Sequence, residues 1–181
     1  MLGGLPPIGH AAEAPARAVA PAAAPVAAAP VVGKPAPPFD LVDAGGTRYT
    51  LETFRGKQGV VLAWFPKAFT PGCTTEIQSL RDSAPALDAY DVAYFMVSLD
   101  PPARNQEFAT AYQGKFPVLS DPSGTTAKAY GVVDGDRAVP WRYTFYIDEE
   151  SVLRAADREV APATAGADVV KTLDQLGFPK R

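Results

Sequence analysis

The 181-residue sequence has a single cysteine, Cys73, and a single histidine, His10. One cysteine excludes an internal disulfide framework and a CxxC redox pair, and it is too few for a thiolate metal site. His10 lies in the low-complexity N-terminal stretch, so the expected folded part has no histidine to act as a base or metal ligand. The chemistry of the chain therefore depends on what the thiol of Cys73 can do.

Long apolar runs and excess positive charge are also missing. No run of about 18 apolar residues exists, so we expect no membrane-spanning helix. The net charge of −3 argues against a nucleic-acid partner and against an anionic membrane surface. We expect a soluble protein for which a cytoplasmic location is favoured, while a periplasmic or exported location stays open.

The N-terminal stretch differs in composition from the rest. Sixteen of the twenty residues 11–30 are alanine or proline, and the recurring prolines interrupt any helix. We expect residues 1–30 to form a disordered tail or linker and residues 31–181 to form one domain. The alternative is that the stretch is the trimmed leader of an exported protein.

Strand and helix patterns alternate through the rest of the chain. Strand patterns occur at 39–51 (a hairpin around Gly45 and Gly46), 59–65, 92–98, 116–121, 142–148 and 152–160. Helix patterns occur after Cys73 (with a bend or end at Pro85) and at 101–114, 123–131 and 164–177. The alternation, with a hairpin before the last helix, predicts an α/β sandwich with a mixed central β-sheet flanked by helices.

Cys73 follows a Thr-Pro-Gly turn between a buried-strand pattern and a helix pattern, where a side chain is both held and exposed. Thr70 is a good N-cap, Pro71 suits the first helical position, and Gly72 allows close backbone approach. In the first turn, unpaired N–H groups and the helix dipole favour a thiolate. Glu76 would not help a thiolate, so we expect it to cap the helix or pair with an arginine.

Several interpretations of Cys73 are open. An inert buried cysteine is one alternative; a Cys-His hydrolase lacks its base, and a thioredoxin-like oxidoreductase lacks its second thiol. Attack on a peroxide oxygen needs only a thiolate, hydrogen-bond donors and a positive charge, and it gives a sulfenic acid.

The stretch "FPKAFTPGCTTEIQSLRD" (65–82) resembles the active-site stretch of peroxiredoxins, with Pro66, Thr70 and Cys73 at the positions of their Pro, Thr and Cys pattern. The flanking "WFPKA" and "SLRD", together with "VLSDPSGTTAKAYGV" and "RYTFYID", are similar to the Q-type, or bacterioferritin-comigratory-protein, subfamily. The resemblance covers about residues 31–177. It implies a thioredoxin-like fold and a thiol-dependent peroxidase for hydrogen peroxide and alkyl hydroperoxides, with no metal, haem or flavin.

The resemblance also implies roles for individual residues. Cys73 would be the peroxidatic thiol, Thr70 would hydrogen-bond the peroxide, Pro66 would shield the thiolate, and Arg142 would stabilise it. Taken singly, Thr70 could be only a helix cap, Pro66 a strand terminator and Arg142 a solvated strand-end charge. A supporting pair between Arg81 and Glu76 is a further, less favoured candidate.

One position departs from the subfamily pattern. Many Q-type members carry a resolving cysteine five residues after the first, where this chain has Gln78. The cycle would therefore be one-Cys, with glutathione, thioredoxin or glutaredoxin as external reductant, in a monomer or homodimer. The alternative function is a non-turnover redox sensor or binding protein, in which oxidation of Cys73 signals to a partner.

Overall fold

The computed structural model describes residues 29–181. The expected tail over residues 1–30 falls almost wholly outside these residues, so the tail and the domain boundary at residue 31 stay predictions. Each strand and most helices of the described part lie within the ranges that the sequence pattern predicts.

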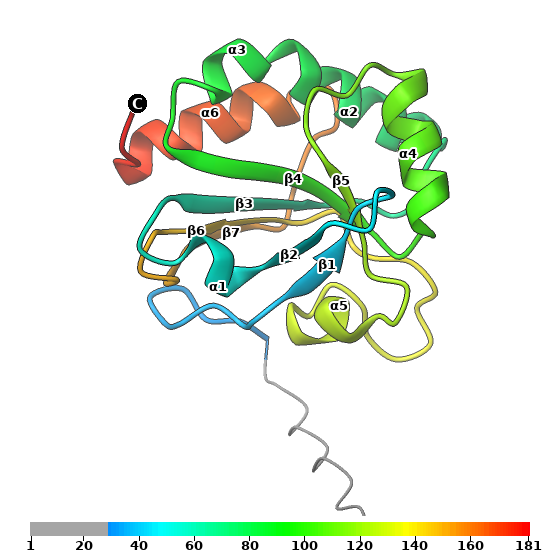
Figure 1. Cartoon of the computed structure of the whole chain (residues 1–181), viewed down its shortest axis with the longest axis horizontal. Helices are drawn as coiled ribbons and strands as arrows, with labels where there is room; N and C mark the ends of the chain where they lie inside the picture. The colour runs from blue at the N-terminus through cyan, green and yellow to red at the C-terminus, as the bar shows by residue number, and fades with distance from the viewer. Residues whose placement is uncertain (1–28) are drawn as a thin grey trace, which may run out of the picture.

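A seven-stranded mixed sheet forms the centre of the fold, in the order β2-β1-β5-β4-β3-β6-β7 (Figure 1). Strand β3 pairs in parallel with β4, and β4 with β5, while the other pairs are antiparallel. The strands are β1 (Asp40–Val42), β2 (Arg48–Thr50), β3 (Gly59–Trp64), β4 (Val92–Ser98), β5 (Val118–Ser120), β6 (Thr144–Ile147) and β7 (Leu153–Asp157). The predicted mixed sheet is confirmed.

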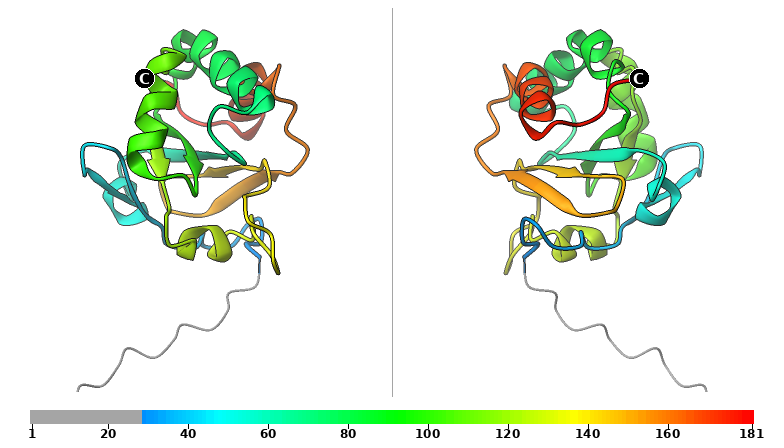
Figure 2. Two further views of the ribbon diagram at one scale, coloured as in Figure 1. Left: turned by 90° about the vertical axis from the view of Figure 1, so that its right-hand side faces the viewer. Right: turned by 90° about the vertical axis from the view of Figure 1, so that its left-hand side faces the viewer.

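Helices cover both faces of the sheet, as Figures 1 and 2 show. One face carries α2 (Pro71–Asp82), α3 (Ala84–Leu87), α4 (Pro102–Ala111) and α6 (Ala165–Leu176), and the other carries α1 (Leu51–Phe54) and α5 (Thr125–Ala129). The bend expected at Pro85 is confirmed, because α2 ends at Asp82 and α3 begins at Ala84.

Strand β3 separates two hydrophobic clusters because successive side chains of a strand point to opposite faces. Val61 and Ala63 belong to the cluster beneath α2, α4 and α6, whereas Val60, Leu62 and Trp64 belong to the cluster on the other face. Every residue of β3 is buried, as its continuous apolar run predicts. Cys73 belongs to the first cluster.

The predicted strand at 142–148 is shorter in the structure, and Arg142 lies before it rather than on it. The last contacts between β6 and β3 are the Thr144–Ala63 pair and the hydrogen bond from the Trp64 N–H to the Tyr143 carbonyl. Strand β3 ends at Trp64, so Arg142 has no strand partner and its side chain is free to reach α2.

Within residues 29–181, the longest apolar helical segments fall short of what a membrane crossing requires.

Candidate active site

Cys73 is the third residue of α2, directly after the loop that leaves β3. The Thr70 carbonyl accepts the first helical hydrogen bond from the Thr74 N–H at 2.9 Å, so the thiol lies in the first turn as predicted. The expectation of an exposed thiol is wrong: Cys73 is 0% exposed. Its side chain packs into the cluster beneath α2 because the first turn faces the sheet.

The Arg142 guanidinium connects Cys73 with a buried carboxylate. Its Nη2 donates to the Cys73 Sγ at 3.4 Å, and its Nη1 forms an ion pair with Oε2 of Glu76. The Glu76 side chain is fully buried, and the Arg142 side chain is 17% exposed. Three charged or ionisable groups from two distant segments thus meet in one largely buried site.

The less favoured pair between Arg81 and Glu76 does not form. Arg81 pairs with Asp82 and donates to the Tyr112 carbonyl at 3.1 Å. Residues five apart on a helix point in different directions, and Glu76 faces inward while Arg81 reaches toward the end of α4. The broader expectation that Glu76 pairs with an arginine is confirmed with Arg142.

Burial controls the ionisation of Glu76. It raises the pKa of the carboxyl from its ordinary 4.5 to about 7, although the positive charge and hydrogen bond of Arg142 act in the opposite direction. Burial lowers the pKa of Arg142, but Glu76 and Cys73 outweigh this effect and raise it overall, so the guanidinium stays charged. Within residues 29–181, Oε1 of Glu76 has no hydrogen-bond partner.

Pro66 and Thr70 both lie in the loop between β3 and α2, and Thr70 is its last residue. Thr70 occupies the N-cap position, but the expected side-chain cap is absent because its hydroxyl donates to the Lys67 carbonyl at 2.9 Å. Both residues are half-buried. Their contacts with a peroxide stay predictions, and so do the catalytic roles of Cys73 and Arg142.

The loop between β3 and α2 is fixed by groups that the sequence analysis did not select. The Ala68 N–H donates to Oδ2 of Asp100 at 2.9 Å, and the same oxygen accepts from the Ser98 hydroxyl at 3.0 Å. Phe69 adopts a left-handed backbone with φ 66°, which is rare for an aromatic residue. Its ring packs on Phe108 at a centroid distance of 5.3 Å, which helps to hold this conformation.

Gly72 leaves room for the guanidinium. A Cβ at this position would lie 3.1 Å from Nη2 of Arg142, closer than side chains normally approach. The glycine of the Thr-Pro-Gly turn therefore allows Arg142 to approach the thiol, which agrees with the close backbone approach expected from the sequence.

One sequence signal for Glu76 was available. Cys73, Glu76, Ile77 and Leu80 follow the i, i+3, i+4, i+7 spacing of one helix face, and all four are buried. A carboxylate on an otherwise apolar stripe indicates a buried partner. No comparable signal marks Phe69, because its backbone conformation depends on packing against α4.

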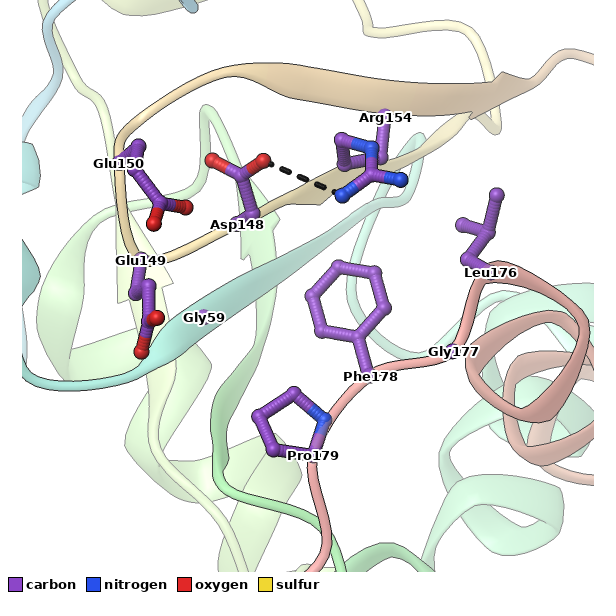
Figure 3. A pocket seen from close by; sticks show the side chains of 9 residues that line it. All are labelled: Gly59, Asp148, Glu149, Glu150, Arg154, Leu176, Gly177, Phe178 and Pro179. Atoms are coloured by element: carbon purple, nitrogen blue, oxygen red, sulfur yellow. Dashed lines mark hydrogen bonds and ion pairs between the residues drawn. The ribbon is translucent and has the colours of Figure 1, made fainter.

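A separate pocket of about 190 Å³ lies at the other end of the sheet (Figure 3). Gly59, the first residue of β3, lines it together with Glu149, Glu150 and Phe178. Cys73 follows the opposite end of β3, about 17–20 Å away for a strand of this length. The pocket is therefore remote from the thiol, and we assign it no part in the thiol chemistry.

Comparison with known proteins identifies the class to which this site belongs. Residues 32–156 match the AhpC/TSA family, and the chain belongs to that family. It is a peroxiredoxin, a thiol-dependent peroxidase with a thioredoxin-like fold, as the sequence resemblance implied.

Individual relatives agree with this assignment. The chain is 38% identical to alkyl hydroperoxide reductase E of Mycobacterium tuberculosis over 70% of this chain and 84% of that protein. The crystal structure of peroxidoxin BcpB from the same organism has a TM-score of 0.72 and 30% identity, covering 80% of this chain and 96% of that one. Peroxiredoxin Q of Xanthomonas campestris has a TM-score of 0.70 and 26% identity, covering 76% and 90%. The Q-type resemblance is confirmed.

Proposed function

We propose that Cys73 is the peroxidatic cysteine and that Arg142 holds it as a thiolate. The observation that carries this assignment is the 3.4 Å contact between Nη2 of Arg142 and the Cys73 Sγ inside a buried site. A nearby guanidinium favours the thiolate, and the first turn of α2 adds the positive end of the helix dipole. The sulfur attacks one peroxide oxygen, the O–O bond breaks, and the leaving oxygen takes up a proton.

In this proposal, Thr70 and Pro66 shape the peroxide position. Thr70 has a hydroxyl at the start of α2, and Pro66 is a rigid apolar residue two positions after the end of β3. When peroxide enters, the Thr70 hydroxyl exchanges its bond to the Lys67 carbonyl for one to the peroxide. The substrates are hydrogen peroxide and alkyl hydroperoxides.

An external thiol completes the cycle, because the chain has one cysteine and carries Gln78 at the resolving position. A reductant thiolate attacks the sulfenic sulfur, water leaves, and a mixed disulfide forms, which a second thiol then reduces. Glutathione, thioredoxin and glutaredoxin are the candidate reductants. The protein contributes only the Cys73 thiol to this cycle and needs no second subunit for it, so a monomer and a homodimer both suit the chemistry.

Intact-mass spectrometry of the reduced chain tests this proposal. One equivalent of peroxide should add one oxygen to Cys73, and added glutathione should convert that species to a glutathione adduct. Cys73→Ser protein is the matched control and should show neither change. Steady-state peroxide consumption with each candidate reductant then separates an enzyme from a sensor: a single oxidation event without turnover would favour the sensor. Absence of any oxygen on Cys73 would refute the assignment.

A further inference from the structure

We propose that Cys73 and Glu76 share one proton across Arg142: Glu76 holds the proton while Cys73 is a thiolate and gives it up when the thiolate is oxidised. Glu76 is thus a positioning and proton-storing residue that acts through Arg142. This inference rests on the proposed role of Cys73 as the peroxidatic thiol.

The geometry provides one cation for two groups that can become anions. Cys73 and Glu76 contact opposite nitrogens of the same guanidinium, and both side chains are 0% exposed. A second buried anion would lack a counter-charge, and leaving a charge unpaired in the interior is strongly unfavourable because it loses its hydration. The favoured states therefore carry a single anion beside Arg142, on either Cys73 or Glu76.

The carboxyl of Glu76 is suited to holding a proton. Oε2 accepts from Arg142, whereas Oε1 is buried and has no partner within the described residues. An unpaired carboxylate oxygen in such a position is unfavourable, but a protonated one is neutral. The raised pKa of about 7 agrees with this geometry and places the exchange near neutral pH. The two groups then share one proton.

No other charged group competes for this role in the described part of the chain. Arg142 is the charged residue that acts on Glu76. The other titratable groups of α2 and of the elements packed around it have different partners or lie at the surface. Arg81 binds Asp82, Asp168 accepts from Thr164, and Asp174 pairs with Lys180. Lys171 is exposed, and the guanidinium groups of Arg104 and Arg158 lie over the rings of Phe69 and Tyr143. Burial raises the pKa of Tyr146, so its phenol stays neutral.

The proton balance of the peroxidase step shows what a proton held on Glu76 would do. The thiolate sulfur bonds to one peroxide oxygen, the O–O bond breaks, and the other oxygen leaves as hydroxide or alkoxide, which needs one proton. The sulfenic acid is neutral, so the thiolate charge beside Arg142 disappears. Glu76 can then ionise and pair fully with Arg142, and the proton it releases balances the leaving oxygen. The step then needs no net proton from the medium.

Proton uptake during oxidation tests the exchange. Reduced protein is mixed with one equivalent of hydrogen peroxide in weak buffer containing a pH indicator, and the thiolate fraction is measured by ultraviolet absorbance beforehand. Near pH 7, where about half of the Glu76 carboxyls hold a proton, the wild-type protein should take up clearly less than one proton per thiolate oxidised. Glu76→Gln should take up more, approaching one. Asp82→Asn, an exposed carboxylate on the same helix, is the matched control and should behave like wild type.

The sulfenic acid can itself ionise beside Arg142, and it does so more readily in Glu76→Gln, so its ionised fraction is measured in each protein and the proton uptake is corrected for it. Equal uptake in the two folded proteins would overturn the inference. Should Glu76→Gln fail to fold, the infrared difference spectrum of wild-type protein decides: loss of a protonated carboxyl band on oxidation supports the exchange, and its absence overturns it. Failure of Cys73 to gain an oxygen, read by mass in the same samples, would overturn the proposed function as well.

Discussion

Glu76 should make the folded protein less stable as the pH rises through neutrality. The comparison uses Cys73→Ser protein, which removes the titration of the thiol, with and without a further Glu76→Gln change. Glutamine has nearly the same shape as glutamate but carries no charge at any pH. The difference between the two proteins therefore isolates the ionisation of the buried carboxyl.

The sign follows from the direction of the pKa shift. In the folded chain the pKa of Glu76 is raised to about 7, whereas in the unfolded chain it is near its ordinary 4.5. Between these values the folded state holds a proton that the unfolded state has lost, so the free energy of unfolding falls as the pH rises. The contribution is fully present below pH 4.5 and is lost once the pH passes about 7.

The magnitude follows from the same two values. A pKa difference of about 2.5 corresponds to about 3 kcal/mol at about 1.4 kcal/mol per pH unit. For a chain of this length, about 3 kcal/mol shifts the melting temperature by roughly 6–12 °C. Urea denaturation at a series of pH values from below 4.5 to above 7 measures the change. Stability curves that stay parallel for the glutamate and glutamine proteins would refute the raised pKa of Glu76.

The remaining predictions concern the guanidinium, the helix packing and the tail. Arg142→Met should slow oxidation of Cys73 about tenfold or more in stopped-flow measurements, since a hydrogen bond to a charged group is worth about 1.5–3 kcal/mol; an unchanged rate would contradict the role of the guanidinium. Gly72→Ala should also slow this reaction, because its Cβ would lie 3.1 Å from Nη2, whereas the melting temperature should change little. Gly166→Ala should lower the free energy of unfolding, measured in urea, by about 1–3 kcal/mol, because its Cβ would lie 2.3 Å from the Ser79 carbonyl oxygen where α6 packs on α2. An unchanged free energy of unfolding would mean that α6 can move away from α2 without cost. Removal of residues 1–30 should leave activity and melting temperature nearly unchanged, and a drop of many degrees would show that the segment docks on the domain.

Hydrophobic patterning predicted much of the fold because burial acts on runs of residues. The continuous apolar runs at 59–65 and 92–98 form β3 and β4, which lie centrally in the sheet and are buried for most of their length. Boundaries were less certain where side-chain pattern does not decide them. The predicted strand at 142–148 begins at Thr144 because the partner strand ends, a property of a different part of the chain.

Single buried polar residues were harder to place. The sequence singled out Cys73 by its turn and Arg142 by resemblance, but it did not say that Arg142 is the arginine that pairs with Glu76. Opposite charges at moderate spacing on one helix suggest a local pair, but burial decides the outcome. Glu76 faces the interior, where only a residue from another segment can reach it, and Arg81 remains near the surface with Asp82.

The meeting of Cys73 and Arg142 depends on the order of strands in the sheet. Cys73 follows the last residue of β3 after a short loop, and Arg142 precedes the first residue of β6 by two positions. Because β6 lies beside β3 and runs antiparallel to it, the end of one strand and the start of the other share an edge of the sheet. The alternation of strands and helices predicts a mixed sheet but does not say which strands are neighbours. The contact that organises this site, between residues 69 positions apart, therefore follows from the topology of the sheet, which local pattern alone cannot supply.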